Sequence, residues 1–179
     1  MSLITDIDTL GTRLHSGEID RQGFVDECVR LACGAIGCSR SGLWIFSETD
    51  TGRALHCLGM YDSEKQRMVQ VADRLQQDSN AYFEALRAEG HVVAIDAKHH
   101  PATRSFYEAG LRPQGVVSMM SAAFSLNGEL FGAFTCSQLH EPAQWTARQL
   151  AILIRIGSRA TLTLAAASPH QLNTLFGSL

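Results

Sequence analysis

Residues 115–138 decide the fold of this chain, with GVVSMMSAAF at 115–124, the turn SLNG at 125–128 and ELFGAFTCSQ at 129–138. Apolar and hydroxyl-bearing residues fill both flanks, as in strands that place one face on a hydrophobic core. Asn127-Gly128 between them is the strongest short sequence signal for a hairpin turn. The stretch therefore predicts two long antiparallel strands.

A second hairpin is predicted upstream. Residues 41–47 are apolar almost without interruption from Leu43 to Phe46, which predicts a central strand covered on both faces. Turn residues at 48–53 lead into a further strand at 54–61. A short apolar strand is also predicted at 91–95, directly before Asp96.

Two helices have clear end signals near the termini. Asp20 can cap a helix that Gly37 ends, and Thr146-Ala147-Arg148-Gln149 is a capping box for a long closing helix. Before them, a narrow apolar stripe predicts a first helix that packs either on its own domain or on a second copy of the chain. The stripe consists of Leu3, Ile7, Leu10 and Leu14.

Further helices are predicted between the strands. Asp78 or Ser79 begins one that ends at Gly90, and Pro101 fits the first turn of another that ends at Gly110. Residues 62–78 carry no clear periodicity, so they form either a short helix or a covering loop.

The order of these elements predicts an α+β fold with α/β/α layers. A central antiparallel sheet would have the terminal helices on one face and the inserted helices and loops on the other, where they enclose a pocket. We divide the chain into an N-terminal helix at 1–17, a main domain at 18–167 and a tail or linker at 168–179.

Composition restricts the class of protein. The chain has 179 residues, 45% of them hydrophobic, and a net charge of −3, which is typical of one globular domain. Basic residues are scattered rather than clustered, which argues against direct nucleic-acid binding. The purely apolar run in the closing helix stops at Arg155, well short of the roughly 20 residues that span a bilayer. We expect a cytoplasmic protein without membrane contact.

The five cysteines have no spacing typical of a metal site. Cys28, Cys33 and Cys38 recur every five residues, which turns their direction by about 140° around a helix each time. They are expected to be buried free thiols in a reducing compartment.

The element order and several short motifs resemble the GAF domain, a small-molecule sensor module of signalling proteins. The similarity covers about residues 20–165, and the motifs are Gly42-Leu43-Trp44-Ile45-Phe46, Ala81-Tyr82-Phe83-Glu84-Ala85-Leu86 before residues 92–97, Gly115-Val116-Val117-Ser118-Met119, Gly132-Ala133-Phe134-Thr135-Cys136 and Trp145-Thr146. The resemblance implies a central antiparallel sheet, a ligand cavity under the inserted helices and a homodimer formed through the terminal helices.

Departures from known branches of this family restrict the ligand. The Asn-Lys-x-Phe-Asp-Glu signature of cyclic-nucleotide-binding members is absent. No cysteine lies between Cys57 and Cys136, which argues against covalent bilin attachment in the pocket segment. Both cysteines fall on predicted strands, which argues against the thiol chemistry of the free methionine sulfoxide reductases. The ligand and any cofactor stay unknown.

The candidate ligand-binding residues combine aromatic side chains with a few polar ones, as small-molecule pockets do. The aromatic residues form either a pocket wall or plain core. The set is Trp44, Phe46, Tyr82, Asp96, His99, Phe106, Tyr107, Ser118, Met120 and Thr135.

Asp96, His99 and His100 are the densest group of ionisable residues. Two imidazoles and a carboxylate are a ligand set for zinc or non-haem iron. Adjacent histidines seldom point the same way, however, and Asp96 can instead cap the next helix or line the pocket. We therefore assign no metal site.

These observations predict a non-catalytic regulatory domain in which ligand binding biases the terminal helices. The chain is either a stand-alone protein or a domain from a larger signalling enzyme, such as a histidine kinase or a diguanylate cyclase. The alternatives are an enzyme of the same fold, thiol-based or metal-dependent, and a ligand-free dimerisation module. A glycine-rich phosphate loop, a G-x-S-x-G elbow and an HExxH motif are all absent from the sequence.

Overall fold

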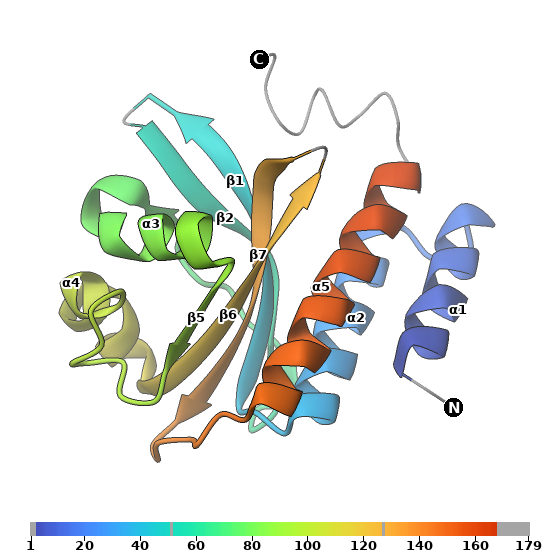
Figure 1. The fold of residues 1–179 in the computed structure, drawn as a ribbon. Helices are drawn as coiled ribbons and strands as arrows, with labels where there is room; N and C mark the ends of the chain where they lie inside the picture. The colour runs from blue at the N-terminus through green and yellow to red at the C-terminus, as the bar shows by residue number, and fades with distance from the viewer. Residues whose placement is uncertain (1–2, 51, 127, 168–179) are drawn as a thin grey trace.

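The computed structural model describes residues 3–50, 52–126 and 128–167, and one antiparallel sheet lies at its centre (Figure 1). The strands follow the order β3-β2-β1-β7-β6-β5, and β4 also pairs with β2. Their bounds are β1 Arg40–Thr49, β2 Gly52–Asp62, β3 Arg67–Met68, β4 Arg74–Leu75, β5 His91–Ala94, β6 Val116–Leu126 and β7 Glu129–Leu139. The predicted α+β class and the central place of the first strand are confirmed.

Three helices cover one face of the sheet, on the right in Figure 1. They are α1 Leu3–His15, α2 Arg21–Ile36 and α5 Ala147–Ala167. The predicted end signals are confirmed, because the backbone N–H of Gly23 donates to Asp20 Oδ1 at 2.7 Å and Gly37 takes a left-handed φ of 73°. Thr146 and Gln149 form both hydrogen bonds of the predicted capping box.

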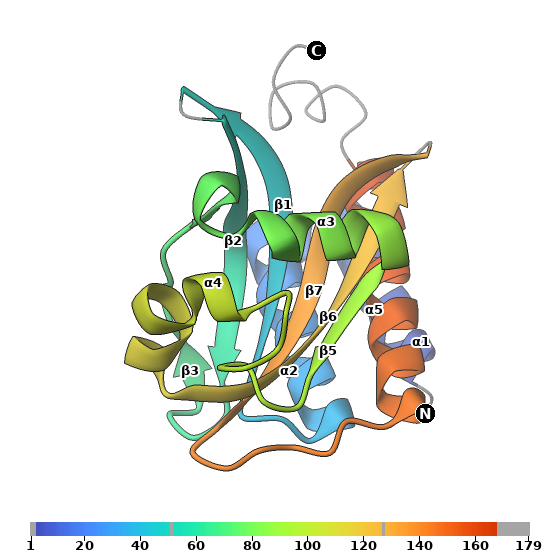
Figure 2. The same cartoon turned by 60° about the vertical axis from the view of Figure 1, so that its left-hand side comes forward.

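Shorter elements cover the opposite face, in front of the sheet in Figure 2. They are η1 Gln76–Asp78, α3 Asn80–Glu89, α4 Arg104–Phe106, η2 Tyr107–Leu111 and η3 Arg112–Gln114. The helix predicted to start at Pro101 and stop at Gly110 is wrong in both bounds. The Thr103 hydroxyl instead donates to the Ala97 carbonyl at 2.6 Å, and a π-helical turn carries the chain past Gly110.

Residues 62–78, which carried no periodicity, form a covering loop with two very short edge strands and the single 3-10 turn η1 at its end. β3 pairs with β2 at Tyr61 and Asp62, and β4 pairs with it at Ala54 and Leu55. Between β3 and β4 the chain is not a strand of the sheet. This stretch forms part of the cavity wall described below.

Two hydrophobic clusters lie on the two faces of the sheet. The cluster on the face of α2 and α5 includes Phe24, Phe134 and Ile156, all fully buried. The other cluster contains most of the aromatic side chains that face α3 and α4. A bulge in β2 opposite Leu43 and Trp44 inserts one residue, so Cys57 and Met60 both face the second cluster.

Two residues of the apolar stripe of α1 are buried within the chain, Leu14 is partly buried, and the side chain of Leu3 lies outside the described residues. Ile7 is fully buried and Leu10 is 7% exposed, both in the helix-side cluster. Asp8 of α1 also pairs with Arg159 of α5 at 2.5 Å. The described part of the stripe therefore packs on its own domain, and the contact with a second copy of the chain stays a prediction.

The long helix α5 is apolar enough to cross a membrane by length and composition alone, with a mean hydropathy of 1.4. Its side chains at Leu153, Ile156, Ala160 and Leu164 are buried in the helix-side cluster. About a third of the apolar window of this helix is buried within the structure.

Candidate functional site

A cavity of about 880 Å³ lies between the segment that carries β4 and the segment that carries α4. Residues 69–75 and 77–79 form one wall, and residues 105–106, 109–110 and 113–114 form the other. Its size falls in the range of small-molecule sites, about 300–1,000 Å³. Several lining residues are apolar, namely Val69, Val71, Ala72, Leu75, Phe106, Ala109 and Pro113.

Local sequence explains the shape of both walls. The Ser79 hydroxyl donates to the Leu75 carbonyl at 2.6 Å, which turns the first wall toward α3. On the second wall, Pro113 lies within η3, and Gly115 ends that turn with a left-handed φ of 73° that glycine adopts without strain. The hydrogen bond of Ser79 thus fixes the end of the first wall, and the turn at Gly115 fixes the end of the second.

The Arg74 guanidinium lies inside an aromatic cage beside this cavity. Its central carbon is 4.5 Å from the centroid of the Phe106 ring, 4.9 Å from that of Tyr82 and 5.1 Å from that of Trp44. Cation–π attraction holds the cation against these faces. The three rings come from three elements, α4, α3 and β1, so the cage exists only in the folded chain.

Arg74 has no acidic partner among the described residues. It takes part in no ion pair there, and its buried Nη1 atom has no hydrogen-bond partner. Burial lowers the pKa of Arg74, while Tyr82 and Cys57 act in the opposite direction. The guanidinium is therefore a cation of this wall without an ion-pair partner among the described residues.

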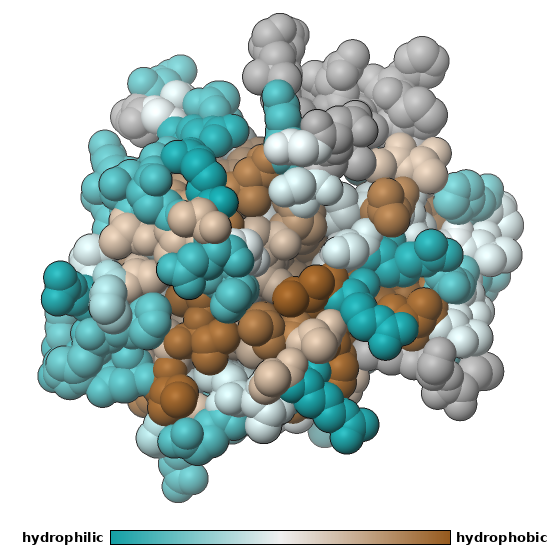
Figure 3. Space-filling model, in the orientation of Figure 1, coloured by the Kyte–Doolittle hydropathy of each residue, from teal (hydrophilic) through white to brown (hydrophobic). Residues whose placement is uncertain are grey.

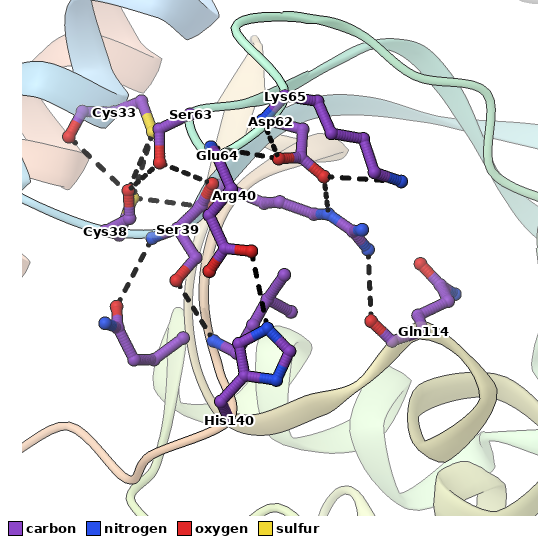
Figure 4. A network of polar contacts seen from close by, with 12 residues as sticks. Cys33, Cys38, Ser39, Arg40, Asp62, Ser63, Glu64, Lys65, Gln114 and His140 are labelled. Atoms are coloured by element: carbon purple, nitrogen blue, oxygen red, sulfur yellow. Dashed lines mark hydrogen bonds and ion pairs between the residues drawn. The ribbon is translucent and has the colours of Figure 1, made fainter.

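A second arginine of the cavity lining, Arg40, is buried and paired (Figure 4). Its Nε donates to Asp62 Oδ2 at 2.7 Å, and its Nη1 donates to the Gln114 carbonyl at 3.3 Å. The Asp62 side chain is 1% exposed and also accepts from the backbone N–H of Lys65 at 3.0 Å. This pair ties β1, β2 and η3 together.

The Asp62 carboxyl is held in its charged form. Burial by itself would raise its pKa, but the backbone N–H of Lys65 and the Arg40 guanidinium outweigh this, so the pKa lies below its ordinary value of 3.8. The Arg40–Asp62 pair is therefore a structural ion pair whose charges satisfy each other.

The sequence of this chain matches the family model described as the GAF domain over residues 20–164. That range contains the sheet, both walls of the cavity and most of α5. The chain belongs to the GAF domain family.

Solved structures share this GAF fold at low sequence identity. The blue-light absorbing form of the Thermosynechococcus elongatus PixJ GAF-domain is 18% identical, with a TM-score of 0.62, over 87% of this chain and 90% of that one. The phycocyanobilin-bound GAF domain from a cyanobacterial phytochrome is 12% identical, with a TM-score of 0.72, over 94% and 97%. The free methionine-R-sulfoxide reductase from Neisseria meningitidis, in complex with its substrate, is 13% identical, with a TM-score of 0.70, over 93% and 89%. None of the curated protein sequences matches this GAF domain.

The structure brings together the aromatic residues that the sequence predicted for the GAF pocket. Trp44, Tyr82 and Phe106 surround Arg74, and Phe106 lines the cavity. Phe46 is not one of these three rings; its ring packs edge-to-face against that of Phe83, with ring centroids 5.3 Å apart. Thr135 is placed under this cage, where its Oγ1 accepts from Trp44 Nε1 at 2.9 Å.

Two predicted residues of the closing hairpin lie away from the cavity. Met120 is fully buried in the cluster on the helix side of the sheet, so assigning it to the pocket face was wrong. Ser118 bonds to backbone groups, donating to the Ile95 carbonyl and accepting from the N–H of Ala143. The bulge between Val116 and Ser118 shifts the register and with it the alternation expected for these side chains.

The remaining predicted residues do not line the cavity. Asp96 and His99 are 60% and 72% exposed, and they bond to each other at 2.7 Å. Asp96 also accepts from the backbone N–H of Lys98 at 3.0 Å, so it caps the turn at the end of β5. Hydrogen bonding to His99 lowers the pKa of Asp96. Tyr107 is half-buried in η2, behind the lining residues Phe106 and Ala109.

Sequence reasoning missed Arg74 and the pair of Arg40 with Asp62. Arg74 falls in the segment without periodicity, and a lone arginine between Asp73 and Leu75 carries no signal of burial. Nothing local distinguishes Arg40, either. The structure shows that the continuous buried run of β1 begins at Arg40 itself.

Among the described residues, no group of three or more histidine, cysteine or acidic side chains is arranged to hold a metal ion. Cys33 and Cys38 lie near each other, with sulfurs 3.7 Å apart, but on the helix side of the sheet. Burial raises the pKa of Cys57, which faces the aromatic cluster, to about 12. No described cysteine lines the cavity.

Proposed function

We propose that this GAF domain is a non-catalytic sensor that binds a small molecule in the cavity between the β4 and α4 segments. The observation that carries the proposal is the cavity itself, of about 880 Å³, whose lining combines apolar side chains with polar and charged ones. Two of the structures named above hold a small molecule, phycocyanobilin in one and a substrate in the other, which supports a ligand-binding role for this fold.

The sheet supplies a route from ligand to output. Arg74 of β4 contacts Trp44, whose neighbour Leu43 packs on the opposite face in the cluster of α2 and α5. Movement of the cavity wall therefore acts on the helix layer through one strand. A ligand shifts that layer only if it binds one arrangement more tightly, and a hundredfold preference corresponds to about 2.7 kcal/mol.

The output surface is proposed to be the outer side of the terminal helices, in a homodimer or against an effector domain. Hydrophobic surface gathers in the middle of Figure 3, over the sheet edge near β5 and the adjoining part of α5. Ile154 and Leu162 of α5 are 41% and 54% exposed. Since Ile7 and Leu10 of the α1 stripe are buried within the chain, these α5 residues are the better candidates for the contact. We further propose a soluble, cytoplasmic setting for the domain.

Thiol catalysis is disfavoured by the position and ionisation of the cysteines. Burial raises the pKa of Cys28 and of Cys57 to about 12, so neither is a thiolate at neutral pH. Iodoacetamide labelling of the native protein, followed by intact mass, should be slow at every site. Denatured protein should take up five labels as the control. Fast native labelling of one thiol would support the enzyme alternative instead.

Native mass spectrometry of freshly purified protein tests ligand retention and oligomeric state together. A dimer that carries extra mass, lost on denaturation, is the expected result. Screening small apolar fragments by NMR then locates the site, and signals from residues 69–79 and 105–114 should shift. Fragments that shift only other regions would contradict the proposed cavity.

A cavity-filling pair of variants makes the location specific. Ala109 lines the cavity and Ala88 is exposed on α3 outside it, so Ala109→Trp should abolish the fragment shifts while Ala88→Trp leaves them in place. Equal fragment binding by both variants would show that the binding site lies elsewhere.

A further inference from the structure

We propose that the ligand of this cavity is a small organic carboxylate with an apolar body, and that its carboxylate group pairs with the Arg74 guanidinium. This inference rests on the proposed sensor function and specifies its ligand class. Three observations carry it: the unpartnered nitrogen of Arg74, the cage that fixes the cation, and the pairing of the other charges along the cavity.

The first observation is a hydrogen-bond donor of Arg74 that has no acceptor. Arg74 lines the cavity, yet its Nη1 atom is buried and has no hydrogen-bond partner. Buried polar groups in folded proteins are almost always hydrogen-bonded, and an unpaired buried charge is strongly unfavourable. A carboxylate oxygen that reaches this nitrogen supplies both the missing acceptor and the missing negative charge.

The second observation is that the cation is held in place in advance. Trp44, Tyr82 and Phe106 contact the guanidinium at 4.5–5.1 Å from its central carbon. Tyr82 is itself fixed, because its hydroxyl donates to Ser121 Oγ at 2.8 Å. A guanidinium positioned by three rings loses little freedom when it binds an anion, which favours affinity.

The third observation is that the other charged side chains of the cavity have partners or face solvent. Arg40 pairs with Asp62, and Lys65 lies 4.0 Å from the same carboxylate. Asp73 is exposed and bonds to His56 at 2.8 Å, and Asp78 is exposed as well. One cation, Arg74, therefore remains for an incoming anion on the described cavity wall.

A single unpaired guanidinium fits a monoanion better than a phosphate group. Phosphate sites gather several N–H donors or cations around a doubly charged group. Here one cation lies beside the apolar side chains of Val71, Leu75 and Phe106, in a lining that is part apolar and part polar. Such walls favour a ligand with one carboxylate at its end and a hydrocarbon or aromatic body.

The test compares 2-naphthoate with its uncharged amide, 2-naphthamide, by isothermal titration calorimetry. The two probes have the same ring system and differ in the group that would meet Arg74. Naphthoate should bind at least tenfold more tightly, a difference of about 1.4 kcal/mol. Loss of naphthoate binding in Ala109→Trp, and not in Ala88→Trp, ties the signal to the cavity.

Variants then assign the preference to Arg74. Arg74→Met keeps much of the length and loses the charge, so it should lower naphthoate affinity at least tenfold and leave naphthamide unchanged. Arg53→Met is the matched control, since Arg53 also lies over an aromatic ring, that of Phe46 at 5.5 Å, but pairs with Glu48. It should leave both affinities unchanged. If Arg74→Met does not fold, the comparison of naphthoate with naphthamide on the native protein still tests whether the cavity prefers a carboxylate.

The other outcomes overturn the inference in distinguishable ways. Equal binding of naphthoate and naphthamide in the cavity would leave the sensor function standing and remove the role of charge. Tighter binding of 2-naphthyl phosphate than of naphthoate would replace the carboxylate by a phosphate. Tighter binding of 2-naphthylmethylammonium, above all to Arg74→Met, would show that the cage takes cations and that Arg74 occupies it in their place. Binding of none of these probes would contradict both the inference and the proposed function.

Discussion

Two arginines that line the same cavity have opposite surroundings. Arg40 donates to a buried carboxylate and to a backbone carbonyl, and it joins three elements. Arg74 lies among three aromatic rings with an unpartnered Nη1 atom. A paired buried charge is part of the structure, whereas an unpaired one in a cavity wall points to a missing partner. The comparison therefore separates the structural end of the cavity from its recognition end.

The largest expected effect follows from breaking the Arg40 pair. Asp62→Asn leaves the Arg40 guanidinium buried without a countercharge, which should lower the free energy of unfolding by about 3–5 kcal/mol. Urea denaturation followed by circular dichroism measures the change. Asp73→Asn is the matched control, because Asp73 is exposed and its removal should cost less than about 1 kcal/mol. Similar losses in both variants would contradict the structural role of the pair.

The same pair predicts an acid limit of stability. The folded pKa of Asp62 is below its unfolded value of about 3.8, so the unfolded chain takes up the proton first as the pH falls. The stabilisation is complete at neutral pH, begins to fall near pH 5 and is lost as the pH passes through the folded pKa. Urea midpoints between about pH 7 and pH 3 should fall less steeply in Asp62→Asn than in the native protein. Parallel curves would assign the acid sensitivity to other carboxyls.

Removing the unpaired arginine should have the opposite sign. Arg74→Met replaces a buried donor without a partner by an apolar chain that packs against the same rings, so the ligand-free protein should gain about 1–3 kcal/mol of unfolding free energy. Thermal and urea unfolding measure this gain. A loss of stability would show that the cation–π contacts outweigh the burial cost, and it would make Arg74 structural like Arg40.

The smallest expected effect concerns Asp96, a residue that the sequence proposed for the pocket. Its exposed side chain caps a turn and bonds to His99 outside the cavity wall. Asp96→Asn should change naphthoate affinity less than twofold, as measured by calorimetry. A larger loss of affinity would return Asp96 to the ligand site and move the site toward β5.

Local signals in the sequence were sufficient for most of the framework. The Asp20 cap, the Thr146 capping box and the two hairpins depend on contacts between neighbours in the chain, so short motifs predicted them. The helix from Pro101 was wrong because Thr103 bonds across to the Ala97 carbonyl instead of starting a helical turn. The motif at the start of a helix does not reveal such a competing contact.

The sequence by itself thus determined the order of elements, the central strand with Trp44 and Phe46, and the family resemblance. These features follow from periodicity and turn chemistry, which act over a few residues. Tertiary structure alone decided that Met120 faces the helices, that Asp62 neutralises Arg40 and that Arg74 enters a ring of aromatic side chains. Burial and charge pairing depend on residues far apart in the chain, and no local pattern encodes which distant side chain will be the partner.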